Sequence, residues 1–197
     1  AMQEAIYIER DVSWLSFNHR VLQEAKDEDN PIYERIKFLA IYSSNLDEFF
    51  RVRIASLRSF KELKKKTRKQ LIDIKPKKAL KTIHKIVAEQ QSEFGRIFWE
   101  EIIPELRERR IHLIDETAFN AAQDEFSRHF CNEKVAQLID VHFMKEGEEE
   151  PFLKGKGLYF IIQFKDMNKS PAILEIPTDQ VKRFVLLPSS GDQHSIA

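Results

Sequence analysis

The stretch PIYERIKFLAIYSSNLDEFFRVRIASLRSF, residues 31–60, decides the fold. Pro31 suits the start of a helix, because proline has no amide donor to lose there. Apolar side chains then recur at helical spacing through both halves: Ile32, Ile36, Leu39 and Ala40, then Leu46, Phe49, Phe50, Ile54 and Leu57. Between the halves, Ser43-Ser44-Asn45 compete with the backbone for hydrogen bonds. The sequence therefore predicts a helical hairpin, formed by two helices or by one helix broken at Asn45.

Asn45 has two candidate roles. With Glu48 three residues later, it has the pattern of a helix start, where the asparagine oxygen caps free amides. Its amide also offers a donor and an acceptor side by side, the pair that reads an adenine edge. The residues alone leave both open: a cap worth about 1 kcal/mol, or a ligand-facing group.

Two further amphipathic segments complete the predicted bundle. The first helix, capped by Asp11 or Ser13, presents an inward face of Trp14, Phe17, Val21, Leu22 and Ala25. The third follows Pro76 and ends near Arg109, with a stripe of Leu80, Ile83, Val87, Phe94, Ile97 and Phe98. We predict an antiparallel three-helix bundle domain over residues 2–108.

Residues 109–197 have a mixed pattern that predicts an α+β domain. We expect a strand at Ile111–Ile114 and a helix from Thr117 to about Met144. Leu158–Phe164 and Ala172–Ile176 predict a β-hairpin, and Phe184–Leu187 a third strand. Because no closing element is evident after the turn at 189–191, we expect this domain to be truncated. The predicted fold class is mainly α, with an α+β second part.

Composition excludes several classes of protein. The 197 residues are 42% hydrophobic and 32% charged, as in globular domains. The formal net charge of zero gives no support for a nucleic-acid partner. A single cysteine, Cys131, fits a reducing compartment. The sequence has no apolar run that would span a membrane and no Gly-rich phosphate-binding loop.

Several charged residues have a structural and a functional interpretation. Asp47 and Arg51 are spaced to pair along a helix. Arg53 lies on the apolar stripe, where it would satisfy a buried carbonyl or carboxylate, or reach a partner domain. Lys61–Lys85 holds eleven basic and two acidic residues. Within it, Lys61–Lys69 is either a solvated helix end or a surface for a polyanion.

The six histidines show no pattern of a metal or hydrolase site. His19, His84, His112, His129, His142 and His194 lack the spacing of metal ligands. His129 and Cys131 are two residues apart and do not face the same way on a helix. We therefore predict no metal ligand and no Ser-His-Asp hydrolase site among these residues.

Three motifs in register resemble the amino-terminal signature of the bacterial polyphosphate kinases. They are RDVSWLSFNHRVLQEA at 10–25, NPIYERIKFLAI at 30–41 and SSNLDEFFRVR at 43–53. A thinner match, LEIPTDQVKRFVLLP at 174–188, resembles the start of the next domain of that family.

The resemblance implies a function for the parent protein. Members of this family reversibly transfer the terminal phosphate of ATP to polyphosphate through a phosphohistidine, with Mg²⁺. The family's asparagine near the adenine of ATP matches Asn45, so the resemblance favours nucleotide contact over a helix cap. The phosphate-accepting histidine lies in a later half of these longer proteins, and no histidine here matches it.

The resemblance also sets expectations for this chain as a non-catalytic, amino-terminal part of the kinase. We expect ATP, ADP and polyphosphate as partners of the parent, and no tightly bound cofactor here. A homo-oligomer in the cytoplasm is expected, with peripheral membrane association left open. The competing interpretation is a non-enzymatic helical scaffold that only mediates oligomer contacts.

Overall fold

The computed structural model describes residues 10–62, 76–145, 147, 151–155, 157–166, 168–189 and 194–197. The prediction for Lys61–Lys69 falls largely outside these residues. The chain divides into two compact units, residues 1–109 and 110–197, which are treated separately below.

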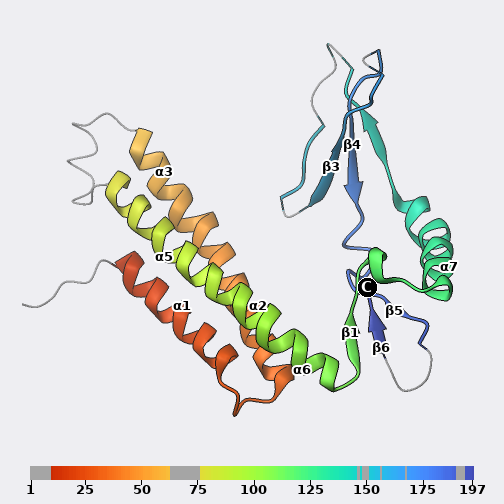
Figure 1. Ribbon diagram of the computed structural model, residues 1–197. Coiled ribbons are helices and arrows are strands. Elements are labelled where there is room, and N and C mark those ends of the chain that lie inside the picture. Colours follow the sequence, from red (N-terminus) through yellow and green to blue (C-terminus); the bar gives the residue numbers. More distant parts are fainter. Residues whose placement is uncertain are drawn as a thin grey trace, which may run out of the picture. The chain divides into compact units, whose positions relative to one another are not determined.

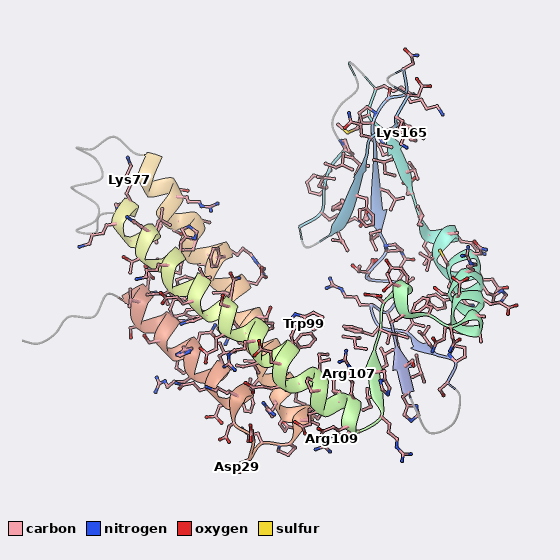
Figure 2. All side chains as sticks on the ribbon, in the orientation of Figure 1. Asp29, Lys77, Trp99, Arg107, Arg109 and Lys165 are labelled. Atoms are coloured by element: carbon pink, nitrogen blue, oxygen red, sulfur yellow. The ribbon has the colours of Figure 1, made fainter. Side chains whose placement is uncertain are left out.

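The first unit is built from three long helical rods (Figure 1). The first rod is α1 (Arg10–Lys26), and the turn after it contains Asp29, labelled in Figure 2. The second joins α2 (Ile32–Phe49), the π-helical η1 (Phe50–Ile54) and α3 (Ala55–Glu62). The third joins α5 (Pro76–Arg96), the π-helical η2 (Ile97–Ile102) and α6 (Ile103–Glu108). This confirms the predicted antiparallel bundle of three helices.

The core of this unit follows the predicted apolar stripes. Its buried residues are Leu15, Leu22, Ala25, Leu39, Tyr42, Leu46, Phe49, Ile54, Leu57, Leu80, Ile83, Val87, Ile97 and Ile102. One residue of the predicted inward face is wrong, because Phe17 is 52% exposed. Leu15 and Asn18, both fully buried, face inward instead. None of the described helices is long and apolar enough to cross a membrane.

The second rod is not broken at Asn45, so the prediction of a helical hairpin in 31–60 is wrong. Helix α2 continues through Ser43, Ser44 and Asn45 to Phe49, and then passes through η1 into α3. Ser43 and Ser44 are exposed. Asn45 directs its amide to a neighbouring helix, so it does not compete with its own backbone.

The second unit holds two small sheets. The elements are β1 (Ile111–Leu113), a 3-10 turn η3 (Glu116–Ala118), α7 (Ala121–Phe130), π-helical η4 (Cys131–Val135), a 3-10 turn η5 (Ala136–Leu138), β2 (Val141–Phe143), β3 (Leu158–Ile162), β4 (Ala172–Ile176), β5 (Leu186–Leu187) and β6 (His194–Ile196). One sheet has the order β1-β6-β5 and the other β2-β4-β3. The antiparallel β3–β4 pair confirms the predicted β-hairpin.

Three predictions for this unit need correction. The helix starts at Ala121, where Asn120 and Gln123 form a reciprocal capping box. It does not reach Met144, because Val141–Phe143 forms strand β2, paired with β4. The expected absence of a closing element after 189–191 is wrong, because β6 pairs in parallel with β1 and antiparallel with β5.

Candidate functional site

A pocket of about 300 Å³ opens where the first turns of α1 meet the end of α2 and the start of η1. It is lined by Arg10, Asp11, Trp14, Asn45, Glu48, Phe49, Val52 and Arg53. The π-helical turn carries two of these residues, and such turns often lie at functional sites. Two other π segments, η2 and η4, occur among the described residues, so this geometry alone does not mark the pocket.

An aromatic pair forms the apolar wall of the pocket. The rings of Trp14 and Phe49 stack with centroids 4.5 Å apart and planes 9° apart. Phe49 is buried and anchored in the core, whereas Trp14 is only partly buried. The rigid pair leaves part of the indole available to a planar ligand, and stacking on aromatic side chains is a common way to hold a nucleic-acid base.

An ion pair joins the two rods beside this wall. Arg53 donates from Nε to Oδ1 of Asp11 at 2.8 Å and from Nη2 to Oδ2 at 3.1 Å. The Asp11 side chain is only 3% exposed, so it requires this partner. The hydrogen bond to Asp11 is the main cause that raises the pKa of Arg53, against the opposing effect of burial. Arg53 therefore satisfies a buried carboxylate, the first of the interpretations open from sequence.

The formal charges of the pocket cancel. Arg10 and Arg53 are cationic, and Asp11 and Glu48 are anionic. Asp11 is committed to Arg53, and Glu48 lies 3.3 Å from Arg51 outside the pocket lining. Such a lining suits an uncharged aromatic ring better than a triphosphate, which binds where cations are in excess.

Asn45 lies inside α2, four residues before its last residue, so it is not a helix cap. Its Nδ2 donates to Oδ1 of Asn18 on α1 at 3.0 Å. Among the described residues, no side chain donates a hydrogen bond to its Oδ1, and Asn45 is partly exposed in the pocket lining. The structure thus leaves one acceptor of Asn45 unused beside the aromatic wall.

Behind Asn45, a buried polar network links the three rods. Asn18 donates from Nδ2 to the backbone oxygen of Tyr42 at 3.2 Å. The Tyr42 hydroxyl donates to Oε1 of Gln90, and Gln90 donates from Nε2 to the backbone oxygen of Leu15, both at 3.2 Å. Burial, with a smaller effect of Glu93, raises the pKa of Tyr42 to about 12.

Sequence reasoning missed this network. The signal for Asn18 was its position: it lies seven residues after Asp11 and four after Trp14, which are helical spacings that place all three on one side of α1. A polar residue on a buried helical face must be hydrogen-bonded, so it predicts a partner on the facing helix.

Arg35 forms a second buried polar centre, which sequence reasoning also missed. It is 3% exposed, and it donates to the backbone oxygen of Ala25 at 2.8 Å. It also donates to Glu101 at 2.8 Å and to Glu105 at 3.1 Å. These contacts join the end of α1 to the third rod, away from the pocket lining.

The remaining predicted residues take structural positions. Arg51 pairs with Asp47 at 2.6 Å on an exposed helix face, as expected from their spacing. His19 lies 2.8 Å from Glu93, and the described residues contain no group of side chains arranged to hold a metal ion.

Comparison with known proteins identifies a family whose sequence model matches this chain. The family model "Polyphosphate kinase N-terminal domain" matches residues 7–114, just over half of the chain. The polyphosphate kinase of Salmonella typhimurium is 37% identical over 191 residues, covering 94% of this chain and 27% of that protein. The polyphosphate kinase of Escherichia coli K12 gives the same identity and coverage.

A solved structure is similar over both units. The crystal structure of polyphosphate kinase from Porphyromonas gingivalis matches with a TM-score of 0.72 and 32% identity. The match covers 95% of this chain and 28% of that one. The chain therefore spans about a quarter of the length of the relatives that it matches.

Proposed function

Because this chain belongs to the polyphosphate kinase family, we propose that it supplies the adenine-binding side of the ATP site of a polyphosphate kinase. In this proposal the base enters the pocket beside Trp14 and Phe49, and Asn45 hydrogen-bonds its edge. The phosphates of ATP point away from the pocket, toward parts of the kinase that this chain does not contain.

One observation carries the proposal: the Asn45 amide, with an unused Oδ1, stands beside an aromatic wall in a pocket without excess charge. An adenine presents a donor and an acceptor on one edge, and an amide complements both. Stacking on an aromatic side chain contributes about 1–3 kcal/mol per base, and each hydrogen bond about 0.5–1.5 kcal/mol. These contributions give binding to the base without a charged partner.

For the whole protein we propose reversible transfer of the ATP γ-phosphate to polyphosphate, through a histidine beyond this chain. Mg²⁺ would serve this reaction by neutralising phosphate charge. The carboxylate of Asp11 does not fit that role, because Arg53 already occupies both of its oxygens. Glu48, the other carboxylate of the pocket, is paired with Arg51 at 3.3 Å. The residues of this chain therefore bind and orient the base and take no part in phosphoryl transfer.

The proposal extends to the assembly and the location of the protein. Family likeness supports a cytoplasmic homo-oligomer, with peripheral membrane association as the alternative, and light scattering of the purified protein tests the oligomer. A scaffold role is the competing function. It is favoured by apolar side chains exposed on the β2-β4-β3 sheet, namely Val141, Phe143, Leu158 and Phe160.

The test uses a full-length polyphosphate kinase carrying this region, with Asn45→Leu and a control, Ser44→Ala. Ser44 is the exposed neighbour of Asn45 and does not line the pocket. Loss of both hydrogen bonds to the base, about 1–3 kcal/mol together, should raise the KM for ATP about 5- to 150-fold in the Asn45 variant. The Ser44 control should leave KM unchanged. An unchanged KM in both variants would contradict adenine binding here and favour the scaffold role.

A further inference from the structure

We infer that Asn18 is a positioning residue that selects adenine over 6-oxopurines by fixing which edge of the Asn45 amide faces the pocket. The inference rests on the proposed function and assigns a role to a buried residue that does not line the pocket itself. It follows from the order in which three groups donate and accept hydrogen bonds.

The order starts at the backbone oxygen of Tyr42. The backbone oxygen of Tyr42 only accepts, so the side-chain atom of Asn18 that lies 3.2 Å from it must be the amide nitrogen. The Oδ1 of Asn18 therefore points the other way, toward Asn45. Because that oxygen also only accepts, the atom of Asn45 that lies 3.0 Å from it must be Nδ2.

This chain of donors settles the orientation of Asn45. An asparagine amide that turns over exchanges its oxygen and nitrogen, and the two arrangements are often close in energy. Here a turned amide would place the Oδ1 of Asn45 against the Oδ1 of Asn18, two acceptors with no proton between them. The side chain of Asn18 is fully buried, so water does not relieve that contact.

The fixed orientation matters because two purine classes have mirrored edges. Adenine carries a 6-amino donor beside the N1 acceptor, whereas hypoxanthine carries a 6-oxo acceptor beside an N1–H donor. An amide that is free to turn over complements either base. For a base whose pose is fixed by its sugar and phosphates, an amide locked with Oδ1 and one N–H toward the pocket complements only one of the two edges. In that pose, Oδ1 opposite a 6-oxo group is repulsive.

The experiment compares ATP with inosine triphosphate as phosphate donors in a full-length polyphosphate kinase carrying this region. The variants are Asn18→Leu and Gln90→Leu. Gln90 is a matched control, because it is buried and makes two side-chain hydrogen bonds in the same network without contacting Asn45. Asn18→Asp is a rescue variant, because burial favours the protonated form of its carboxyl group. That form donates O–H to the backbone oxygen of Tyr42 and keeps an acceptor facing Asn45.

Wild type and Gln90→Leu should prefer ATP by about 5- to 150-fold in kcat/KM, the range for a correct against a mirrored bidentate contact. Asn18→Leu should reduce this preference to within about 3-fold, and Asn18→Asp should keep it. Both leucine variants should lower Tm, so stability alone does not separate them.

Two results would overturn the inference, and they are distinguishable from failure of the proposed function. A preference retained in Asn18→Leu, or lost equally in Gln90→Leu, would remove the role of Asn18 while Asn45→Leu still raises the KM for ATP. If Asn45→Leu leaves the KM for ATP unchanged, the pocket does not hold the base and the proposed function itself fails.

Discussion

Replacing Arg35 measures how much one buried cation contributes to the stability of the helical bundle. Its guanidinium holds the backbone oxygen of Ala25 in the last turn of α1, as well as Glu101 and Glu105. In Arg35→Ala the two glutamates remain 21% and 27% exposed and can be hydrated, whereas the carbonyl loses a charged donor. That hydrogen bond is worth about 1.5–3 kcal/mol, and the buried stem adds about 1–2 kcal/mol. We expect the free energy of unfolding to fall by about 2.5–5 kcal/mol.

The assay is urea unfolding of this chain, followed by far-ultraviolet circular dichroism, because urea carries no charge and does not screen ion pairs. The control is Arg109→Ala. Arg109, at the end of α6 (Figure 2), also pairs with Glu105 at 2.8 Å, but it is 57% exposed. Its loss should cost less than about 0.5 kcal/mol. Arg35→Met keeps most of the stem and should recover part of the loss. Equal losses of unfolding free energy in Arg35→Ala and Arg109→Ala would refute the argument that the contribution of Arg35 to stability depends on its burial.

Two further predictions concern other groups of the bundle. Because burial raises the pKa of Tyr42 from 10.0 to about 12, its contribution to stability is intact below pH 10 and is lost as the pH rises toward 12. Urea unfolding over this range should show wild type losing stability more steeply than Tyr42→Phe, and equal slopes would contradict this. Arg53→Ala should destabilise by about 2–3 kcal/mol because it strands buried Asp11; the loss is below that of a fully buried pair, since Arg53 is 33% exposed. Arg51→Ala strands only the exposed Asp47 and Glu48 and should cost less than about 0.5 kcal/mol. Thermal unfolding measures the loss of stability in both variants. A larger loss in Arg51→Ala than in Arg53→Ala would contradict the pairing of Arg53 with buried Asp11.

The helices were predictable because periodicity reports burial directly. Leu46, Phe49, Ile54 and Leu57 were expected on one stripe, and all four are buried. The continuity of the second rod was not predictable in the same way. The preference of Asn45 for a cap or a helix interior depends on whether another helix offers its side chain a partner, and that partner, Asn18, lies 27 residues earlier. Local propensity contains no such information.

The second unit shows the same limit for strands. Val141–Phe143 follows a helical segment and is only three residues long, too short for a period of two to be distinguished from a period of 3.6. It is a strand because β4 supplies its hydrogen bonds across about 30 residues of sequence. The longer β3 and β4 were predictable, since all five positions of β3 and four of the five of β4 are apolar or β-branched, and polar turns bound them.

For the candidate site, the sequence identified Asn45 and Arg53 but not what orients them. Arg53 stood out as a charge on an apolar stripe, which predicts a buried partner without naming it. The partner, Asp11, was interpreted as a possible helix cap, because acids near helix starts usually serve the helix itself. Only the packing of α1 against η1 shows that this carboxylate serves Arg53 instead.

The side chain of Asn45, on the second rod, is oriented by Asn18 on the first rod, which is itself held by the backbone of the second. Asn18 on α1 donates a hydrogen bond to the backbone oxygen of Tyr42 on α2 and accepts one from Asn45, three residues further along α2. The Asn45 amide therefore turns over only if α1 and α2 separate or Asn18 breaks both bonds. The Trp14–Phe49 stack joins α1 to α2, and the Asp11–Arg53 pair joins α1 to η1 of the same rod, so the amide is oriented before any ligand arrives. A base that binds there meets a group whose conformational entropy has already been lost on folding, which is the physical condition for selective recognition by a single side chain.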